Sequence, residues 1–319
     1  MPIEWGCSLS GVSLIVPYYH MVSDNYVPHV NRLYRFRTIA EFTADVEYLL
    51  RHFQPVTLSD IVDQLNGTRT LKRPSFHLTF DDGFREMYDV VAPILQRAGA
   101  PATFFINTAF VDGGGLAHHN ALSVLLDRLQ SNPSPVIFQR AASLLPAEES
   151  DQTNLRARIL SIRQTEKSLV RSLAETLELD LDQYIRQNQP YLSSEQIAAL
   201  LDRGFGIGAH SHDHPRYSDL PLSEQIGQTL MSMDFLETRF GIKPKAFAFP
   251  YTDSGVEGAF FDSVFAGPLL DVSFGTAGLV PHFHPRNIER MSMEKTSAPA
   301  AQILARQFAR TTYFRLQPH

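Results

Sequence analysis

Short apolar runs alternate with amphipathic helical patterns through most of the chain. Apolar residues recur at helical spacing in the segments 39–53 and 226–240, and Gly241 follows the second as a typical helix end. Ser193 with Gln196 is a capping-box start for another helix. This alternation favours a parallel β/α architecture over a sandwich. The predicted strands cover residues 13–17, 75–80, 102–107, 205–210, 246–250, 272–274 and 288–293.

The alternation stops between about residues 116 and 190, where the pattern is mostly helical. We expect one domain over residues 1–319, with a helical insertion that leaves it near 113–115 and returns at Tyr191. Long insertions in β/α folds often lie beside the catalytic face. The insertion is therefore interpreted either as a packing appendage or as a lid or partner surface.

Composition narrows the possible classes of protein. The 319 residues are 44% hydrophobic, enough for a large core, and carry a net charge of −6 without a long basic run, which argues against nucleic-acid binding. The single Cys7 excludes an intrachain disulfide and a cysteine-rich zinc site. No apolar stretch is long enough to cross a bilayer, and the first residues lack the pattern of a signal peptide. These features predict a cytoplasmic protein without a transmembrane segment; protein partners stay open.

Two segments bring together residues that can carry chemistry. An apolar strand pattern ends in Asp81-Asp82-Gly83, and a second strand pattern ends where His210 and His214 follow. Parallel β/α folds keep their chemistry at such strand ends. Successive side chains of an extended segment point to opposite sides, so the two carboxylates would have different roles.

Each segment has an ordinary interpretation by itself. Asp-Asp-Gly is commonly a turn, and two loop histidines are commonly solvated. Together, one carboxylate and two imidazoles form a ligand set that leaves positions open for water and substrate. The combination predicts a mononuclear metal site with a spare carboxylate beside it.

At these residues the chain resembles the polysaccharide deacetylases that share the NodB homology domain. The segment 79–83 (Thr-Phe-Asp-Asp-Gly) is similar to their first motif, and 210–214 (His-Ser-x-x-His) to their second. The segment 18–22 (Tyr-Tyr-His-Met-Val) is similar to the opening of the branch that acts on biofilm poly-N-acetylglucosamine. The resemblance implies a distorted (β/α)7 barrel of NodB-homology type.

The resemblance also implies the site roles. Asp81 would be the general base, His20 the general acid, and Asp82, His210 and His214 the ligands of one divalent ion. Zinc is favoured, with cobalt, nickel or iron as alternatives.

The chain departs from the family pattern in two places. Ala248 stands where many members have the arginine that orients the catalytic Asp; Arg290 is a candidate substitute, with a structural surface salt bridge as the alternative. A late Leu-x-x-His motif is missing, which favours His20 as the acid and leaves His282 and His284 in reserve.

We therefore expect a metal-dependent hydrolase that removes an N-acyl group, most often N-acetyl, from an amino sugar in a polysaccharide or glycan precursor. The backbone N–H of Tyr251 would help to stabilise the oxyanion. Three alternatives stay open: a deformylase or deacylase of a lipid- or nucleotide-linked sugar, an enzyme on non-carbohydrate amides, and a catalytically inactive carbohydrate-binding homologue.

Overall fold

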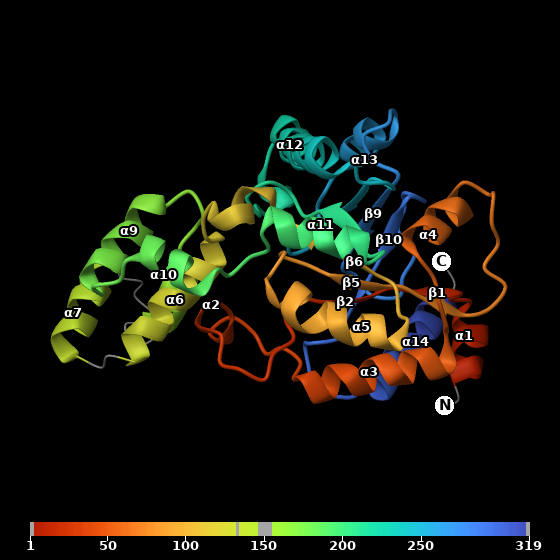
Figure 1. Ribbon diagram of the computed structural model, residues 1–319, viewed down its shortest axis with the longest axis horizontal. Coiled ribbons are helices and arrows are strands. Elements are labelled where there is room, and N and C mark those ends of the chain that lie inside the picture. Colours follow the sequence, from red (N-terminus) through yellow and green to blue (C-terminus); the bar gives the residue numbers. More distant parts are fainter. Residues whose placement is uncertain (1–2, 132–133, 146–154, 317–319) are drawn as a thin grey trace. The chain divides into compact units, whose positions relative to one another are not determined.

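The computed structural model describes residues 3–131, 134–145 and 155–316 and divides into two units (Figure 1). Unit 1 comprises Met1–Asp24, Phe36–Val111 and Tyr191–His319, and unit 2 comprises Asn25–Arg35 and Asp112–Pro190. The residues of the two sequence motifs lie in unit 1. The helical segment noted in the sequence lies in unit 2.

Unit 1 is built on a parallel sheet with the order β10-β9-β8-β7-β6-β5-β2-β11. A single residue, Arg290, separates β10 from β11, yet β10 pairs with β9 and β11 pairs with β2. The one segment 287–292 therefore joins both edges of the sheet, so the strands form a nearly closed barrel with seven positions. This confirms the predicted distorted β/α barrel. Its strands are β2 (Pro17–Tyr19), β5 (Leu78–Phe80), β6 (Ala102–Ile106), β7 (Gly206–Ala209), β8 (Ala246–Ala248), β9 (Val272–Gly275), β10 (Asn287–Glu289) and β11 (Met291–Ser292).

A small parallel sheet precedes the barrel in unit 1. Its order is β1-β4-β3, with β1 at Leu14–Ile15, β4 at Ser75–Phe76 and β3 at Gln54–Pro55. Only Val16 separates β1 from β2, and only His77 separates β4 from β5. The two barrel strands β2 and β5 are thus continuations of the small sheet.

Local sequence signals begin and end many of the helices of unit 1. Thr38 and Glu41 form a capping box at α3, and Ser193 and Gln196 form the expected one at α11. Gly241 takes the left-handed conformation that ends α12. The helices of unit 1 are α1 (Ile3–Ser10), α3 (Ile39–His52), α4 (Leu58–Leu65), α5 (Ala92–Ala98), α11 (Ser194–Asp202), α12 (Leu222–Phe240), α13 (Gly258–Phe265) and α14 (Ala300–Leu316), with short turns at Met87–Val91, Thr108–Gly113 and Tyr217–Asp219.

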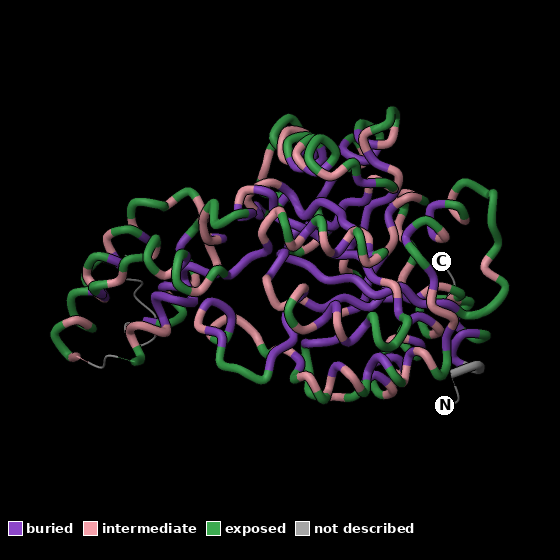
Figure 2. The backbone as a smooth tube through the Cα atoms, in the orientation of Figure 1, coloured by how far each residue is buried: buried purple, intermediate pink, exposed green. Residues whose placement is uncertain are grey.

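Strand alternation separates two apolar cores in unit 1. Along β6, Phe104 belongs to the large core that also includes helix residues, whereas Phe105 belongs to a smaller core formed largely by strand residues. The strands are almost continuously buried (Figure 2). Gly208 on β7 is required by close packing, because a Cβ there would lie 2.5 Å from the Phe105 ring. The barrel interior is therefore filled by side chains.

Unit 2 has its own helical core. A buried cluster including Leu122, Leu125 and Leu173 packs its helices together. The separate segment 25–35 belongs to this unit, since Asn120 donates to the His29 carbonyl at 2.7 Å. The helices are α2 (Pro28–Asn31), α6 (His118–Ser131), α7 (Pro135–Leu144), α8 (Leu155–Leu160), α9 (Lys167–Thr176) and α10 (Leu181–Asn188).

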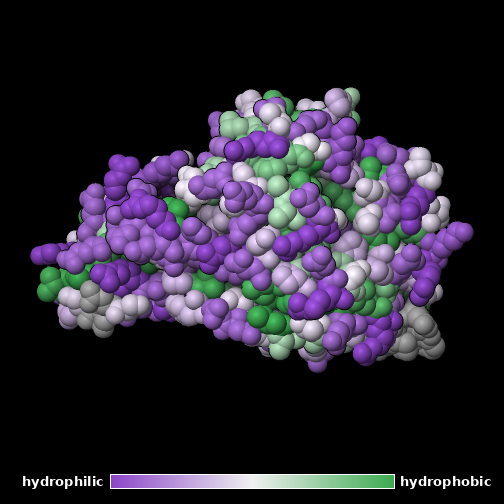
Figure 3. Space-filling view, viewed as in Figure 1, coloured by the Kyte–Doolittle hydropathy of each residue, from purple (hydrophilic) through white to green (hydrophobic). Residues whose placement is uncertain are grey.

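The surface carries mostly hydrophilic side chains on the face that Figure 3 shows, with hydrophobic ones in smaller groups. Among the helices of the described residues, none is both long and apolar enough to span a membrane.

Candidate metal and catalytic site

Both motif carboxylates follow the carboxyl end of β5 and are buried. Asp81 still continues the ladder, because its N–H donates to the Tyr19 carbonyl at 2.9 Å. Asp82 leaves the strand with a φ of 76°, and Gly83 follows with 72°. The expected alternation of an extended strand thus does not reach Asp82; a turn orients this carboxylate instead.

The histidine motif forms a tight loop beyond β7. The N–H of His210 donates to the Ile106 carbonyl at 2.9 Å and extends the strand by one residue. Ser211 then has a φ of 67°, and its hydroxyl accepts from the N–H of His214 at 3.0 Å. Asn107, directly after β6, donates through its amide to the His210 carbonyl. These contacts turn the two imidazoles back toward Asp82.

The side chains of Asp82, His210 and His214 converge on one point. Asp82 Oδ1 lies 3.2 Å from His214 Nε2 and 3.5 Å from His210 Nε2, and the three residues are almost completely buried. Burial raises the pKa of Asp82, but the neighbouring imidazoles outweigh it and hold this pKa well below its usual range. Asp82 is therefore a carboxylate.

The proton positions of this cluster fit a cation. His210 Nδ1 is 2.8 Å from the Ala248 carbonyl and must donate to it, so neutral His210 presents a lone pair at Nε2. Asp82 Oδ1 is buried without a hydrogen-bond donor among the described residues. Two acceptor atoms thus face each other in a buried space. Ligands at about 2.1 Å from a tetrahedral ion are roughly 3.4 Å apart, which matches the spacings around Asp82.

Arg290 holds the other carboxylate. Its two terminal nitrogens lie 2.7 and 2.8 Å from Asp81 Oδ1 and Oδ2, and its Nε donates to the Gly275 carbonyl at 3.1 Å. The guanidinium packs between the rings of Tyr18 and Phe105. Because Arg290 is fully buried, the alternative of a surface salt bridge is wrong.

This ion pair fixes the charge of Asp81. Burial raises the pKa of Asp81, but the positive charge of Arg290 outweighs it, so the pKa lies below its usual value. The bidentate pairing also fixes the orientation of the carboxylate. Asp81 is thereby an ionised and immobile proton acceptor.

His20 lies after β2 and is tied to a carboxylate that sequence reasoning missed. His20 Nδ1 lies 2.8 Å from Glu294 Oε2, and the backbone N–H groups of His20 and Met21 donate to the same carboxylate. Burial lowers the pKa of His20, whereas the hydrogen bond and charge of Glu294 raise it, with a net rise to about 9. The imidazole is thus protonated at neutral pH.

Tyr251 follows β8 and borders the cluster of Asp82, His210 and His214. Its ring lies edge-on to His214 with 4.6 Å between centroids, and the Arg216 guanidinium lies over the same ring, 4.9 Å from its centroid. Its φ is 59°. Asp82, Ser211, His214 and Tyr251 are four of the seven described non-glycine residues with positive φ, so backbone strain concentrates at this site.

The other two charged or titratable residues of the histidine motif, His212 and Asp213, contact side chains outside the cluster of Asp82, His210 and His214. His212 Nδ1 contacts Thr108 Oγ1 at 3.0 Å, and Asp213 accepts from Gln228 at 2.8 Å. The Nδ1 of the His210 ring instead lies 2.8 Å from the Ala248 carbonyl. A backbone acceptor on another strand leaves no signal in the sequence, whereas Asn107 could have been suspected from its place directly after a strand.

A second cluster in unit 1 contains Asp253, His282 and Glu289. His282 Nε2 lies 3.7 Å from Asp253 Oδ2, while His284 stacks on Phe265 with 4.6 Å between centroids. The two reserve histidines are therefore engaged around this cluster, and the described contacts give them no link to Asp82.

Comparisons with known structures agree with this fold. The Streptococcus pyogenes deacetylase PplD in complex with acetate has a TM-score of 0.60 at 13% identity, with 93% of this chain and 98% of that chain covered. IcaB from Ammonifex degensii has a TM-score of 0.58 at 19% identity, with coverages of 92% and 97%. A de-N-acetylase from Aggregatibacter actinomycetemcomitans has 0.55 at 16% identity, with 91% and 99% covered. At these identities the likeness establishes the fold.

The family itself follows from the sequence match. No curated protein matches the chain in sequence. The polysaccharide deacetylase family model matches residues 68–257, more than half of the 319 residues, and includes both the Asp-Asp and the His-x-x-x-His segments. The chain therefore belongs to the polysaccharide deacetylase family.

Proposed function

We propose that the protein hydrolyses the N-acetyl group of an amino sugar in a polysaccharide or glycan precursor, with one divalent ion held by Asp82, His210 and His214. Zinc is favoured because two imidazoles and one carboxylate suit it. The observation that carries the proposal is the convergence of Asp82 Oδ1, His210 Nε2 and His214 Nε2 in a buried space beside the ion pair of Asp81 with Arg290. When bound, the ion would polarise the amide carbonyl and lower the pKa of water from about 16 toward about 7.

Asp81 is the proposed general base. Its carboxylate is kept ionised by Arg290, and each oxygen retains lone-pair capacity beyond the one that Arg290 occupies. It would accept a proton as water attacks the amide carbon. Arg290 acts as a positioning residue, because it holds Asp81 in one orientation and contacts it from the barrel interior.

His20 is the proposed general acid. With Nδ1 directed at Glu294, the protonated ring carries its second proton on Nε2. This proton would pass to the departing amine, and the positive charge of the ring is supported by Glu294. Glu294 is a further positioning residue in this scheme.

The backbone N–H of Tyr251 is proposed to stabilise the negative oxygen that develops on the amide carbon. Two contacts hold this residue in place: the ring packs on His214, and the carbonyl accepts from Thr276 Oγ1 at 3.3 Å. A fixed backbone donor of this kind needs no reorganisation during the reaction.

A catalytically inactive homologue is disfavoured. That alternative was supported by Ala248, where many family members carry an arginine. Arg290, between β10 and β11, supplies a guanidinium to Asp81. The Asp81 carboxylate is therefore paired although Ala248 stands in place of the family arginine.

The test is acyl release by protein that has been stripped with a chelator and reconstituted with zinc. Acetate and formate are measured with polymeric, lipid-linked and nucleotide-linked N-acyl amino sugars. We expect acetate release that depends on about one equivalent of zinc. Replacement of Asp81 by Asn should retain the metal and lower turnover by ~10²–10⁴-fold. Full turnover without a divalent ion, or no acyl release by metal-loaded protein from any substrate, would refute the proposal.

A further inference from the structure

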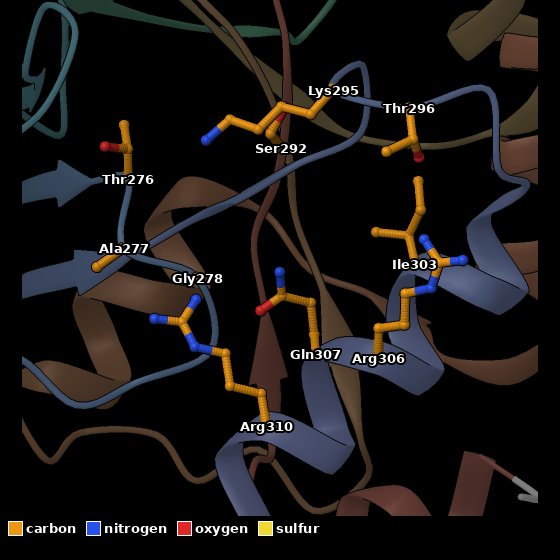
Figure 4. A pocket seen from close by; sticks show the side chains of 10 residues that line it. All are labelled: Thr276, Ala277, Gly278, Ser292, Lys295, Thr296, Ile303, Arg306, Gln307 and Arg310. Atoms are coloured by element: carbon orange, nitrogen blue, oxygen red, sulfur yellow. The ribbon is translucent and has the colours of Figure 1, made fainter. Parts of the chain in front are cut away.

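A cavity of about 170 Å³ lies between α14 and two loops of the barrel. One loop follows β9 and contributes Thr276 and Gly278; the other follows β11 and contributes Lys295. Figure 4 shows Arg306, Gln307 and Arg310 projecting from α14 toward these loops, with Lys295 extending from the opposite side. Three cationic side chains thus surround one small space.

The three cationic side chains of this cavity belong to exposed residues, and no acidic residue lines the space with them. The lining contains no Asp or Glu, although the whole chain has a net charge of −6. Arg306 and Arg310 are four residues apart on α14, a spacing at which like charges repel. Within residues 3–131, 134–145 and 155–316, neither arginine nor Lys295 forms an ion pair with a carboxylate.

A purely structural reason accounts for only part of this arrangement. Arg310 packs over the Phe314 ring at 5.6 Å, and the helix dipole favours positive charge in the last turn of α14, where Arg315 rather than Arg306 or Arg310 lies. Neither effect applies to Lys295, which lies on a loop outside α14. The three side chains border one space from separate elements, an arrangement that an anion in the cavity would stabilise.

The cavity is connected to the proposed catalytic residues by short contacts. Thr276 Oγ1 donates to the carbonyl of Tyr251, and the N–H of Gly278 donates to the carbonyl of Arg290 at 3.0 Å. Lys295 directly follows Glu294, which binds His20. Both loops leave the carboxyl ends of parallel strands, as do the loops that carry Asp81 and His210, so all of these loops lie at the same end of the barrel.

We propose that this cavity, with Lys295, Arg306 and Arg310, binds a phosphate or pyrophosphate group of the substrate. The inference rests on the proposed function and narrows its substrate class to N-acyl amino sugars that carry a phosphate ester near the reacting unit. The volume equals that of about five to six water molecules in the liquid, which suits a phosphate group. Guanidinium groups match phosphate oxygens in pairs, and three cations suit an anion with more than one charge.

The experiment compares charged and neutral substrates in the zinc-loaded full chain. The charged substrates are a nucleotide diphosphate-linked and a lipid diphosphate-linked N-acetylglucosamine, and the neutral one is an N-acetylglucosamine oligomer. The variants are Lys295→Gln and the pair Arg306→Gln with Arg310→Gln. Arg315→Gln, on the same helix but outside the cavity lining, is the matched control for the loss of one charge.

We expect KM for a diphosphate-linked substrate to rise about tenfold for each removed cation, the low end for a charge-assisted hydrogen bond, with kcat unchanged. The kinetics on the neutral oligomer and those of Arg315→Gln should stay at the wild-type values. Whichever diphosphate-linked substrate shows the variant-dependent KM identifies the source of the anion. Equal KM changes in Arg315→Gln, or on the neutral oligomer, would overturn the proposal.

Pyrophosphate binding tests the anion site independently of the proposed function. Titration calorimetry should show weaker binding to the Arg306→Gln, Arg310→Gln protein than to Arg315→Gln, since any binding at the metal affects both alike. If that difference is found but no substrate loses its acyl group, the proposed function fails and the anion site stands. If the neutral oligomer is deacetylated and the cavity variants change neither KM nor pyrophosphate binding, only the anion site fails.

Discussion

Two buried clusters in unit 1 have the same kinds of side chain and opposite proton arrangements. Asp82, His210 and His214 form one, and Asp253, His282 and Glu289 form the other. In the first, a histidine Nδ1 donates to a carbonyl and leaves Nε2 as an acceptor. In the second, His282 Nδ1 accepts from the N–H of His284 at 3.0 Å, so neutral His282 carries its proton on Nε2, toward Asp253.

The carboxyl groups of the two clusters also differ in their pKa values. The pKa of Asp82 is held well below its usual range. Burial raises the pKa of Glu289, and the adjacent Asp253 raises it further, to about 8. The first cluster therefore fits a cation, whereas Glu289 of the second keeps a proton that it shares with Asp253. Residue types and proximity alone do not mark a metal site; the partner of the second ring nitrogen decides it.

The second cluster has a structural role, which the proton shared by Glu289 and Asp253 makes possible. Asp253 accepts from the N–H of Thr276 at 3.2 Å and from the Asn287 amide at 2.9 Å, and Glu289 accepts from the N–H of Ala277 at 2.6 Å. Both carboxyls lie over Gly275, where a Cβ would be 2.3 to 2.4 Å from their oxygens. The cluster thus ties the loop after β9 to β10, next to Arg290.

The largest expected effect is a difference in metal content between a variant of the first cluster and a variant of the second. His214→Ala should lose the ion and reduce activity to background, because two ligands do not replace three. Glu289→Gln should retain about one equivalent of metal, since an amide can still share hydrogen bonds with Asp253. Elemental analysis of the two purified variants, alongside the wild type, measures this. Metal loss in Glu289→Gln with retention in His214→Ala would reverse the assignment.

The pH profile tests the acid that we place beside the first cluster. A general acid must be protonated, so activity should fall as pH rises through the pKa of His20, which Glu294 raises to about 9. A cation at Asp82 repels a protonated imidazole, so the limb should lie at or below this pH. His20→Ala should lower turnover by ~10²–10⁴-fold and erase the basic limb. Glu294→Gln should keep the limb but move it to lower pH; an unmoved limb would remove Glu294 from the mechanism.

Arg290 directly follows Glu289 of the second cluster and binds Asp81, the neighbour of Asp82, and it gives a test of stability. Arg290→Gln leaves Asp81 buried without its partner, and such a change typically costs about 3–5 kcal/mol. Urea unfolding of the protein should show this loss. The double variant Asp81→Asn, Arg290→Gln removes both charges and should recover a large part of it. A single variant within about 1 kcal/mol of the wild type would mean that Asp81 does not depend on Arg290.

The sequence predicts the repeating part of the fold well. Strand and helix periodicities are local, so the seven strand regions and the caps at Ser193 and Gly241 could be found from neighbouring residues. The assignment of 25–35 to the helical unit could not, because contacts such as Asn120 with His29 join residues 91 positions apart. The closure of the barrel at Arg290 could not be predicted either, because it depends on the pairing of β10 with β9 and of β11 with β2.

The candidate site shows the same division between local and distant information. The motif side chains that converge, Asp82, His210 and His214, stand in short recognisable segments. Glu294, which is 274 residues from His20, has no motif of its own. The proton positions that distinguish the two clusters depend on backbone groups of Ala248 and His284, which are present at every residue. Composition therefore reveals which residues can bind a metal, and only the fold shows which cluster fits a cation.

The smallest expected effect concerns stability at alkaline pH. Glu289 keeps its proton in the folded state up to about pH 8, whereas in the unfolded chain it ionises near its ordinary value of 4.5. The folded state then binds more protons than the unfolded one between these values, so its stability falls as pH rises. Glu289→Gln removes this slope. Its melting temperature should match that of the wild type near pH 5 and exceed it at pH 9. The matched control is Glu47→Gln on the exposed face of α3, which should show no such crossover. A wild-type protein whose stability relative to Glu289→Gln does not change from pH 5 to 9 would mean that Glu289 is ionised throughout, and the contrast between the clusters would then be lost.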